Sequence, residues 1–377
     1  MSTPVRIGIL FGGPSAEHEV SCASALGVAR ALADAGHQVV AIGVTRTGGF
    51  RLVPEATLAQ LRAAVGTGLA IEDRLTVTGP VVELRSGERP GTLAVTAADT
   101  PGTVEAELDV VFPVLHGPYG EDGVVQGLLE SLGVPYVGCG ILASAIGMDK
   151  VAMKRALRAE GVPVTPQVSF DAQTYRAVDD PEKLVLGLRR PLFVKPARMG
   201  SSIGISRVAE GDDLAAAVEA ALEHDNVVVV EQGVTGRELE AGVLGGWRPE
   251  ASAVGEVQVK GGWFDYQQKY FGDSDPMIVP AVLPDEVTER IRELSVRAFA
   301  AIGGWGLARV DFLYDEANGD LYVNELNTLP GFTAHSMYPK VWAESGVSYQ
   351  ELVNRLVELA FVRHAERPAS ARLEETR

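Results

Sequence analysis

The chain has 377 residues, with 50 acidic against 33 basic side chains and a formal net charge of −17. This charge argues against a surface that binds nucleic acid electrostatically, although a small basic pocket for a nucleotide remains compatible with it. The start of the chain lacks a secretory pattern, no apolar run approaches the roughly 20 residues of a membrane span, and Cys22 and Cys139 form no CxxC pair. We therefore expect a cytoplasmic enzyme of roughly two to three domains that binds neither nucleic acid nor membrane.

The first part of the chain predicts a β–α–β unit and hence a parallel sheet. An apolar strand ends in Gly12-Gly13, and the helix that follows stops at Gly36. Residues 46–107 are less regular and are interpreted as an insertion with some strands. The expected elements are strand 5–11, helix 16–35, strand 38–44, strand 110–115, helix 124–132 and a closing apolar segment at 134–137.

The rest of the chain mixes helices and strands without an internal repeat. The expected elements are helix 143–160, strand 192–196, strand 205–208, helix 212–223, strand 227–231, helix 284–301, a hairpin at 307–327 and helix 349–362. Domain boundaries near Val137 and Glu231 predict an N-terminal domain (1–138), a central subdomain (139–231), a C-terminal subdomain (232–365) and a tail (366–377).

A glycine-rich loop at 199–204 lies between two expected strands, and Lys195 comes just before it. Such a loop can present backbone N–H groups to an anion, with the lysine supplying charge. A tight turn beside a surface lysine explains the loop equally well. The chain contains neither the GxxxxGK[ST] pattern of a P-loop nor the GxGxxG pattern of a dinucleotide site, so a dehydrogenase of the Rossmann type is disfavoured.

The hairpin at 307–327 carries the second candidate site. Alternation along each strand puts Arg309 and Asp311 on one face, and Glu325 and Asn327 on one face of the partner strand. Carboxylate and amide oxygens are ligands that suit Mg²⁺ or Mn²⁺. A solvated face with salt bridges is the competing interpretation.

The turn of this hairpin decides whether the polar side chains meet. A three-residue loop at 317–319, with Gly319 in the left-handed conformation, gathers the ionic side chains on one face. A two-residue Asn-Gly turn would put the two carboxylates on opposite faces, so we favour the longer loop. The predicted pairs are Tyr314 with Tyr322, Asp311 with Glu325 and Arg309 with Asn327.

Several further segments, taken in order along nearly the whole chain, resemble the D-alanine–D-alanine ligases of the ATP-grasp superfamily. The resemblance implies an α/β N-terminal parallel-sheet domain followed by an ATP-grasp fold of two α+β subdomains. The segments are Gly12–Ser21, His116–Gly123, Met148–Lys150, Val194–Gly204, Tyr266–Tyr270 and Asn324–Ser336.

The resemblance implies an enzyme that activates a first D-alanine as an acyl phosphate with ATP and joins it to a second, forming D-alanyl-D-alanine for peptidoglycan synthesis. Two Mg²⁺ or Mn²⁺ ions are implied, held by Asp311, Glu325 and Asn327. The implied ATP contacts are Lys150, Lys195, Ser202, Glu231, Gln232, Val234, Glu238 and Lys269. The implied catalytic residues are Glu17, Ser201, Tyr270, Arg309 and Gly331, and the implied substrate contacts are Glu17, His116, Arg309, Gly331, Ser336 and Met337.

Tyr270 and Lys269 are expected on a loop at 259–276 that closes over the site. Met199 and Gln232 stand where relatives carry an acid and a lysine, which concerns loop and adenine contacts rather than the reaction. His116 contacts the second substrate or caps the following helix. A homodimer is expected by analogy. The alternatives are a ligase with D-serine or D-lactate as second substrate, and a non-catalytic nucleotide-binding protein on the same fold.

Overall fold

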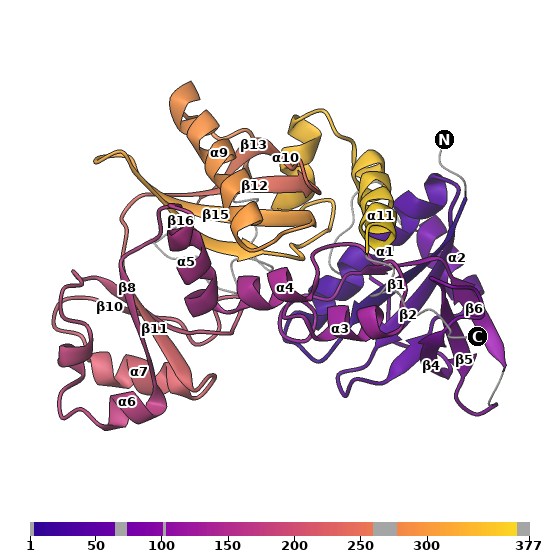
Figure 1. Ribbon diagram of the computed structural model, residues 1–377, viewed down its shortest axis with the longest axis horizontal. Coiled ribbons are helices and arrows are strands. Elements are labelled where there is room, and N and C mark those ends of the chain that lie inside the picture. Colours follow the sequence, from indigo (N-terminus) through magenta and orange to yellow (C-terminus); the bar gives the residue numbers. More distant parts are fainter. Residues whose placement is uncertain (1–3, 65–73, 101–102, 259–276, 368–377) are drawn as a thin grey trace.

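The computed structural model describes residues 4–64, 74–100, 103–258 and 277–367. These residues form three β-sheets of seven, four and five strands. Figure 1 shows the N-terminal sheet on the right, the central sheet at lower left and the C-terminal sheet above and between them. Each sheet carries its own helices, which is the expected α/β and α+β architecture.

The N-terminal sheet has the strand order β6-β5-β4-β3-β2-β1-β7. β1 lies parallel to β2 and β7, as predicted, whereas β3 to β6 continue the sheet in antiparallel fashion. The described part of 46–107 therefore extends the edge of the first sheet. The strands are β1 (Arg6–Gly12), β2 (Gln38–Val44), β3 (Phe50–Leu52), β4 (Val81–Ser86), β5 (Leu93–Ala97), β6 (Val104–Leu108) and β7 (Val110–Pro113). The predicted closing strand at 134–137 is reduced to a single bridge between Val111 and Tyr136.

Helix α1 (His18–Asp34) is buried along most of its length because its sequence is rich in small residues that let the helix lie close to the sheet. The last helix of the chain, α11 (Tyr349–Ala365), packs beside α1, as Figure 1 shows. Leu26 of α1 and Leu356 of α11 belong to one hydrophobic core. The two ends of the chain thus share a core. The other helices around this sheet are α2 (Glu55–Ala64) and α3 (Val124–Ser131).

The central sheet has the order β10-β9-β11-β8 and a separate core that includes Leu192, Val218 and Val230. The apolar run of β11 explains this core, because a strand buried on both faces is almost continuously apolar. The elements are β8 (Gln167–Asp171), α6 (Ala172–Arg176), η1 (Pro181–Leu184), β9 (Leu192–Pro196), β10 (Ser206–Val208), α7 (Leu214–Leu222) and β11 (Val227–Gln232).

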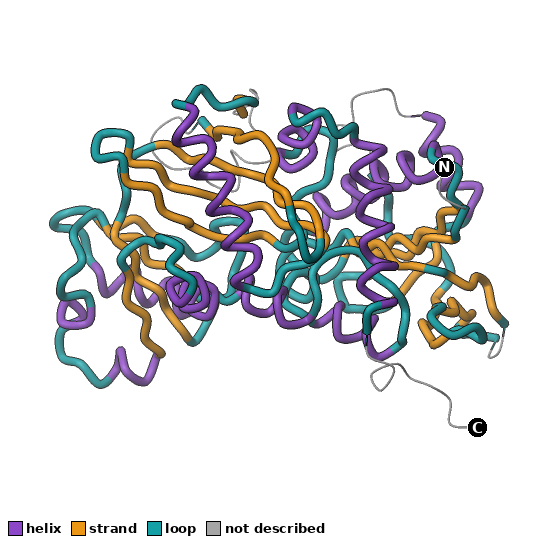
Figure 2. Tube along the Cα trace, turned by 45° about the horizontal axis from the view of Figure 1, so that its top comes forward, coloured by secondary structure: helices purple, strands orange, loops and turns teal. Residues whose placement is uncertain are grey.

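The C-terminal sheet has the order β14-β13-β12-β15-β16. Figure 2 shows α9 lying across its strands, and Ile291 and Phe299 of this helix are buried against them. The elements are β12 (Arg237–Gly245), β13 (Glu250–Val257), β14 (Met277–Ile278), α9 (Asp285–Ala301), β15 (Gly306–Asp315), β16 (Asp320–Asn327) and α10 (Met337–Glu344). Across the part of the chain that the structure describes, no helix is long and apolar enough to span a membrane.

The predicted single helix at 143–160 is wrong, because two helices occur there: α4 (Ile141–Met148) and α5 (Lys150–Ala159). Asp149 leaves the helical conformation, with φ −88° and ψ 104°, and its carboxylate accepts hydrogen bonds from the N–H groups of Val151 and Ala152. An aspartate that caps a new helix satisfies donors that a continuous helix would have bonded itself. The break makes Lys150 the first residue of α5.

Candidate functional site

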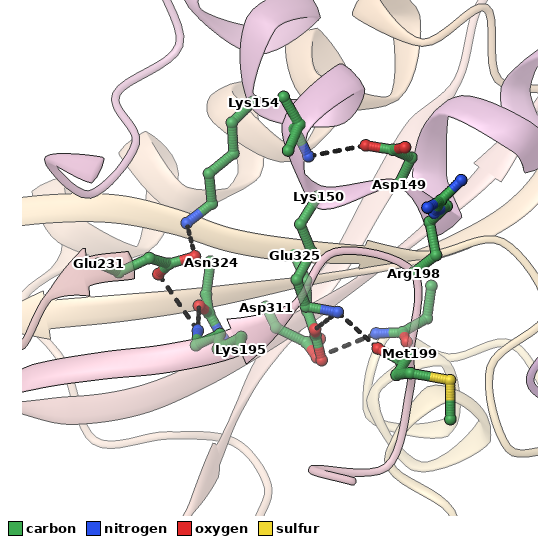
Figure 3. A network of polar contacts seen from close by, with 12 residues as sticks. Asp149, Lys150, Lys154, Lys195, Arg198, Met199, Glu231, Asp311, Asn324 and Glu325 are labelled. Atoms are coloured by element: carbon green, nitrogen blue, oxygen red, sulfur yellow. Dashed lines mark hydrogen bonds and ion pairs between the residues drawn. The ribbon is translucent and has the colours of Figure 1, made fainter. Parts of the chain in front are cut away.

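A polar cavity of about 830 Å³ lies between the central and C-terminal sheets. Strands β9 and β11 and the glycine-rich loop form one wall, and β12, β15 and β16 form the other. Figure 3 shows side chains from both walls pointing toward one another. The cavity is lined by Lys150, Lys195, Ser201, Ser202, Glu231, Gln232, Val234, Glu238, Asp311 and Glu325, all of which the sequence singled out, together with Glu240 and Asn324, which it did not.

The two lysines expected to contact phosphate enter this cavity from different elements. Lys150 begins α5, and its Nζ donates to the carbonyl of Met199, 2.7 Å away, and lies 3.8 Å from Oε2 of Glu325. Lys195 lies on β9, with its Nζ 3.4 Å from Oδ1 of Asn324. Both lysines are largely buried, so their charge acts inside the cavity rather than in bulk water.

Glu231, which is expected at the adenine end, lines the cavity beside Gln232, and its carboxylate contacts two amines. Oε1 lies 2.6 Å from Nζ of Lys154, and Oε2 lies 3.2 Å from Nζ of Lys195. Thr165 Oγ1 donates to Oε2 at 3.0 Å and accepts from Lys154 at 2.7 Å. Burial opposes the charge on Glu231, but the two amines outweigh it and lower the pKa of this carboxyl.

The hairpin brings the expected metal ligands together. β15 and β16 pair Asp311 with Glu325 and Arg309 with Asn327, as predicted. Arg309 binds Asp311 through two contacts of 2.7 Å, and its Nε lies 2.9 Å from Oε2 of Glu240 on β12. These neighbouring carboxylates outweigh the effect of burial and raise the pKa of Arg309 well above its ordinary value.

The rest of the predicted register is wrong. Tyr314 pairs with Leu321 rather than with Tyr322, because Asp315 pairs with Asp320 and the turn is one residue longer than expected. A β-bulge between the Asp311 and Phe312 pairs absorbs the extra residue, Asn324. A regular strand would send successive side chains to opposite faces, so the bulge is what lets both Asn324 and Glu325 line the cavity.

The donor set of Asp311, Glu325 and Asn327 fits divalent cations that prefer oxygen ligands. Among the described residues, Asp, Glu, His and Cys side chains form no group of three or more that could hold a metal ion. The amide of Asn327 would supply the third ligand beside the two carboxylates. Its Nδ2 lies 3.0 Å from Oδ2 of Asp311, which places the amide beside the carboxylate.

The glycine-rich loop has a strained backbone. Ser201 and Ser202 adopt φ of 52° and 59°, in the left-handed region that residues other than glycine rarely occupy. Such strain persists only where the surroundings hold it, and it is common at ligand-binding loops. Met199 contacts Lys150 through its backbone carbonyl. The Met199 side chain, which stands where relatives carry an acid, takes no part in this contact.

The N-terminal domain meets the loop at a second, smaller cavity of about 220 Å³, lined by Ser15, Glu17, Met199 and Gly200. Gly117 has φ of 72°, in the left-handed region that favours glycine, and a Cβ atom placed on it would lie 2.7 Å from Oε2 of Glu17. Glu17 is thus held between the His116–Gly123 loop and the glycine-rich loop.

His116 is buried, and both ring nitrogens contact protein: Nδ1 lies 2.8 Å from the carbonyl of Leu329 and Nε2 lies 3.3 Å from Oγ of Ser24. Glu121 accepts from the N–H groups of Leu329 at 3.2 Å and Gly117 at 2.7 Å. Burial lowers the pKa of His116. His116 and Glu121 thus bind the backbone carbonyl and the backbone N–H of Leu329, which lies two residues before Gly331.

Gly331 and Ser336 lie on the turn that leads into α10. A Cβ placed on Gly331 would lie 3.0 Å from Oγ of Ser336, and that hydroxyl also contacts Oγ1 of Thr333 at 2.8 Å. The side chain of Met337 is buried among Val257 and Val341. Met337 can therefore present only backbone atoms to a ligand.

The expected adenine and ribose contacts line the far end of the cavity. Gln232 accepts from the N–H of Arg189 at 3.1 Å, and Val234 and Glu238 follow along the wall. Lys269, Tyr270 and the expected closing loop at 259–276 lie outside the described residues.

The functional residues that the sequence analysis missed are Lys154, Glu240 and Asn324. Two of them carried a usable signal. Lys154 follows Lys150 by four residues and so shares its helix face, and Glu240 follows Glu238 by two along a strand. The bulge that brings Asn324 into the cavity had no signal in the sequence.

Two α+β sheets facing each other across a polar cavity, attached to an N-terminal α/β domain, define the ATP-grasp class of fold. The family model of the D-ala D-ala ligase N-terminus matches residues 6–139, and that of the C-terminus matches residues 131–358. The chain belongs to the D-alanine–D-alanine ligase family.

Individual relatives agree with this assignment. The chain is 46% identical to a D-alanine–D-alanine ligase of Mycolicibacterium smegmatis, over 95% of this chain and 96% of that protein. It is 45% identical to one of Mycobacterium avium, over 96% and 98%. Among solved structures, the D-alanine-D-alanine ligase from Coxiella burnetii has a TM-score of 0.81 at 32% identity, covering 97% and 96% of the two chains. VanG D-Ala:D-Ser ligase from Enterococcus faecalis has a TM-score of 0.78 at 33% identity, covering 95% and 100%.

Proposed function

We propose that this protein joins two D-alanine molecules into D-alanyl-D-alanine for peptidoglycan synthesis, converting ATP to ADP and phosphate. One observation carries the proposal: Lys150 and Lys195 share a single cavity with the Asp311–Glu325 pair. Cations that hold phosphates opposite oxygen ligands for a divalent metal are what phosphoryl transfer requires. A non-catalytic nucleotide-binding protein would not need both the phosphate-binding lysines and the metal ligands.

In the first step the carboxylate of one D-alanine attacks the γ-phosphorus of ATP, ADP leaves, and an acyl phosphate forms. Activation is needed because a free carboxylate does not accept an amine at neutral pH. Lys150, Lys195 and Lys269 hold the phosphates, and Ser202 supports them from the glycine-rich loop. Glu231, Gln232, Val234 and Glu238 contact the adenine and ribose, and the carboxylate of Glu231 also contacts Lys195.

Asp311, Glu325 and Asn327 would hold two Mg²⁺ or Mn²⁺ ions, which would neutralise the charge of the transferring phosphoryl group. Arg309 contacts both Asp311 and Glu240. Glu240 can therefore hold the guanidinium in place when Asp311 binds a cation. Arg309 thereby stays beside the reacting carbonyl.

In the second step the amine of the second D-alanine attacks the acyl carbon, phosphate leaves and the nitrogen loses a proton. Arg309 and the N–H of Gly331 stabilise the oxygen that becomes negative. Glu17 binds the ammonium of the first D-alanine, and Ser336 with the backbone at Met337 receives the carboxylate of the second. His116 acts through Leu329, whose carbonyl it contacts. Ser201 acts from the glycine-rich loop, whereas Tyr270 lies outside the described residues.

The test is direct. The protein is incubated with ATP, Mg²⁺ and D-alanine, and released phosphate and dipeptide are measured, the latter by mass. We expect phosphate and dipeptide in equal amounts, both dependent on D-alanine. ATP binding without phosphate release would favour the non-catalytic alternative.

The second substrate is examined in the same assay, because a structural relative is named a D-Ala:D-Ser ligase. We expect D-alanine to be preferred over D-lactate, since the phenol of Tyr270 does not repel an incoming ammonium, and the same assay ranks D-serine. A homodimer and a cytoplasmic location, where ATP is supplied, complete the proposal. Sedimentation of the purified protein tests the first of these.

A further inference from the structure

Lys154 is a buried charge that the reaction described above does not use. Its side chain is 0% exposed, although lysine is almost never fully buried without a partner. It lies on α5 with its Nζ 2.6 Å from Oε1 of Glu231 and 2.7 Å from Oγ1 of Thr165. Figure 3 shows it on the far side of Glu231 from Lys195. Lys154 therefore does not line the cavity, and it can influence a bound nucleotide only through Glu231 and Lys195.

The charges around Glu231 do not balance in pairs. One carboxylate lies between two amines, Lys154 at Oε1 and Lys195 at Oε2. The shorter contact is made by the deeper lysine, which leaves about one positive charge on the cavity side. If Lys154 were uncharged, Glu231 would pair with Lys195 alone, and that lysine would meet an incoming phosphate as half of a neutral pair.

We propose that Lys154 is a positioning residue that neutralises Glu231 and so leaves the charge of Lys195 available to the phosphates of ATP. This inference rests on the proposed function, because it takes the ligand of Lys195 to be a nucleoside triphosphate. Thr165 supports the arrangement, since its hydroxyl accepts from Lys154 and donates to Glu231 and thereby fixes the carboxylate between the amines.

The test compares Lys154→Met with the double variant Lys154→Met/Glu231→Gln. The single change leaves Glu231 with Lys195 as its only charged partner, so the dissociation constant and the KM of ATP should rise about 10-fold or more while kcat changes little. The double change removes the competing carboxylate as well. It should restore ATP affinity to within about 3-fold of the unaltered protein.

A purely structural lysine predicts that ATP affinity follows stability, because removing one partner of a buried ion pair destabilises the fold and removing both relieves that cost. The proposal instead predicts weaker ATP binding in Lys154→Met with the melting temperature of the ATP-free protein unchanged, so a loss of affinity that appears only together with a lowered melting temperature would contradict it. A double variant that binds ATP no better than the single variant would overturn the proposal. If Lys154→Met alone does not fold, the double variant still decides, since its affinity is compared directly with that of the unaltered protein.

Arg155→Met is the matched control, because Arg155 is the exposed neighbour of Lys154 on the same helix. It should leave ATP affinity unchanged. Direct ATP titration separates the two levels of inference. An unaltered protein that binds no ATP contradicts the proposed function itself, whereas unchanged affinity in Lys154→Met contradicts only the role of Lys154.

Discussion

At the scale of single residues, Asp311 contacts neighbouring side chains and would also have to bind a cation. Arg309 contacts both of its carboxylate oxygens, and Asn327 contacts one of them. Asp311→Asn keeps the shape and removes the charge that a cation requires. We expect kcat to fall by about 10²-fold or more with little change in the melting temperature, measured by phosphate release and thermal unfolding.

The control for this change is Asp320→Asn, which removes an exposed carboxylate from the neighbouring strand β16. It should leave kcat unaltered. A normal rate in Asp311→Asn would show that Asp311 does not bind the metal.

Glu121 offers a prediction about pH. Burial, reinforced by the nearby Glu17 carboxylate, raises the pKa of Glu121 from its ordinary 4.5 to about 8. A carboxyl whose folded pKa is raised contributes stability that is present below the unfolded pKa and is lost as pH rises through the folded pKa. The free energy of unfolding should therefore fall between about pH 4.5 and 8 because of this group.

Glu121→Gln cannot ionise and should lack that part of the pH dependence. The measurement is the difference in unfolding free energy between the two proteins across this range. Parallel profiles would mean that Glu121 titrates normally. Glu121 accepts hydrogen bonds from two backbone N–H groups. Glutamine would turn its NH₂ group, a donor, toward one of them, so the variant should be less stable at low pH.

The residue types at the site could be predicted from the sequence, but their present partners could not. Asp311 and Glu325 were expected to meet because a hairpin brings its strands together. That Arg309 also binds Glu240 depends on β12, which pairs with β15 from about 70 residues earlier in the chain. Lys154 on α5, Glu231 on β11 and Thr165 in the segment before β8 likewise converge.

At the scale of elements, the break between α4 and α5 decides where Lys150 points. Asp149 caps α5 through the N–H groups of Val151 and Ala152, both at 2.9 Å. Asp149→Ala removes the cap and should lower the free energy of unfolding by about 1 kcal/mol. Because Lys150 is the first residue of α5, the KM of ATP should rise as well, measured in the phosphate-release assay.

The comparison variant is Asp213→Ala, since Asp213 caps α7 in the same manner, through Ala216 N–H. Its loss of stability should be similar and its effect on the KM of ATP negligible. Equal changes of KM in both variants would mean that Asp149 acts through general stability alone.

Propensity and periodicity located most elements but not this break, because residues 141–159 are helix-forming on both sides of Asp149. The hairpin shows the same limit. Its two functional pairs were right while the end nearest the turn was not, since a longer turn and a bulge shift the register in opposite directions. Such compensating irregularities leave no trace in an alternating pattern.

At the scale of the whole molecule, the net charge of −17 contrasts with a cavity whose wall carries Lys150 and Lys195, with Lys154 buried behind Glu231. The lysines account for only part of this contrast, because the carboxylates of Glu231, Glu240, Asp311 and Glu325 lie close by. The local balance of buried pairs, rather than the total charge, sets the attraction for a polyphosphate.

The hydrophobic cores divide the molecule differently from the chain. One core joins α1 of the N-terminal domain to α11 at the far end of the chain, and His37 reinforces it by contacting Asn354 at 3.3 Å. The central sheet has a core of its own. The two ends of the chain are therefore expected to open together, and the central subdomain separately.

Two matched substitutions test this division. Leu356→Ala in α11 and Leu192→Ala in β9 each truncate a leucine that is at most 1% exposed, so each should cost about 2–5 kcal/mol locally. Hydrogen exchange should rise in α1 and β1 as well as in α11 for the first variant, and in β8 to β11 for the second. Faster exchange confined to α11 in Leu356→Ala would mean that the shared core does not couple the two ends. Since the cavity lies between the central and C-terminal sheets, ATP should slow exchange in the central sheet of both variants by favouring the arrangement in which Lys195 faces Asp311.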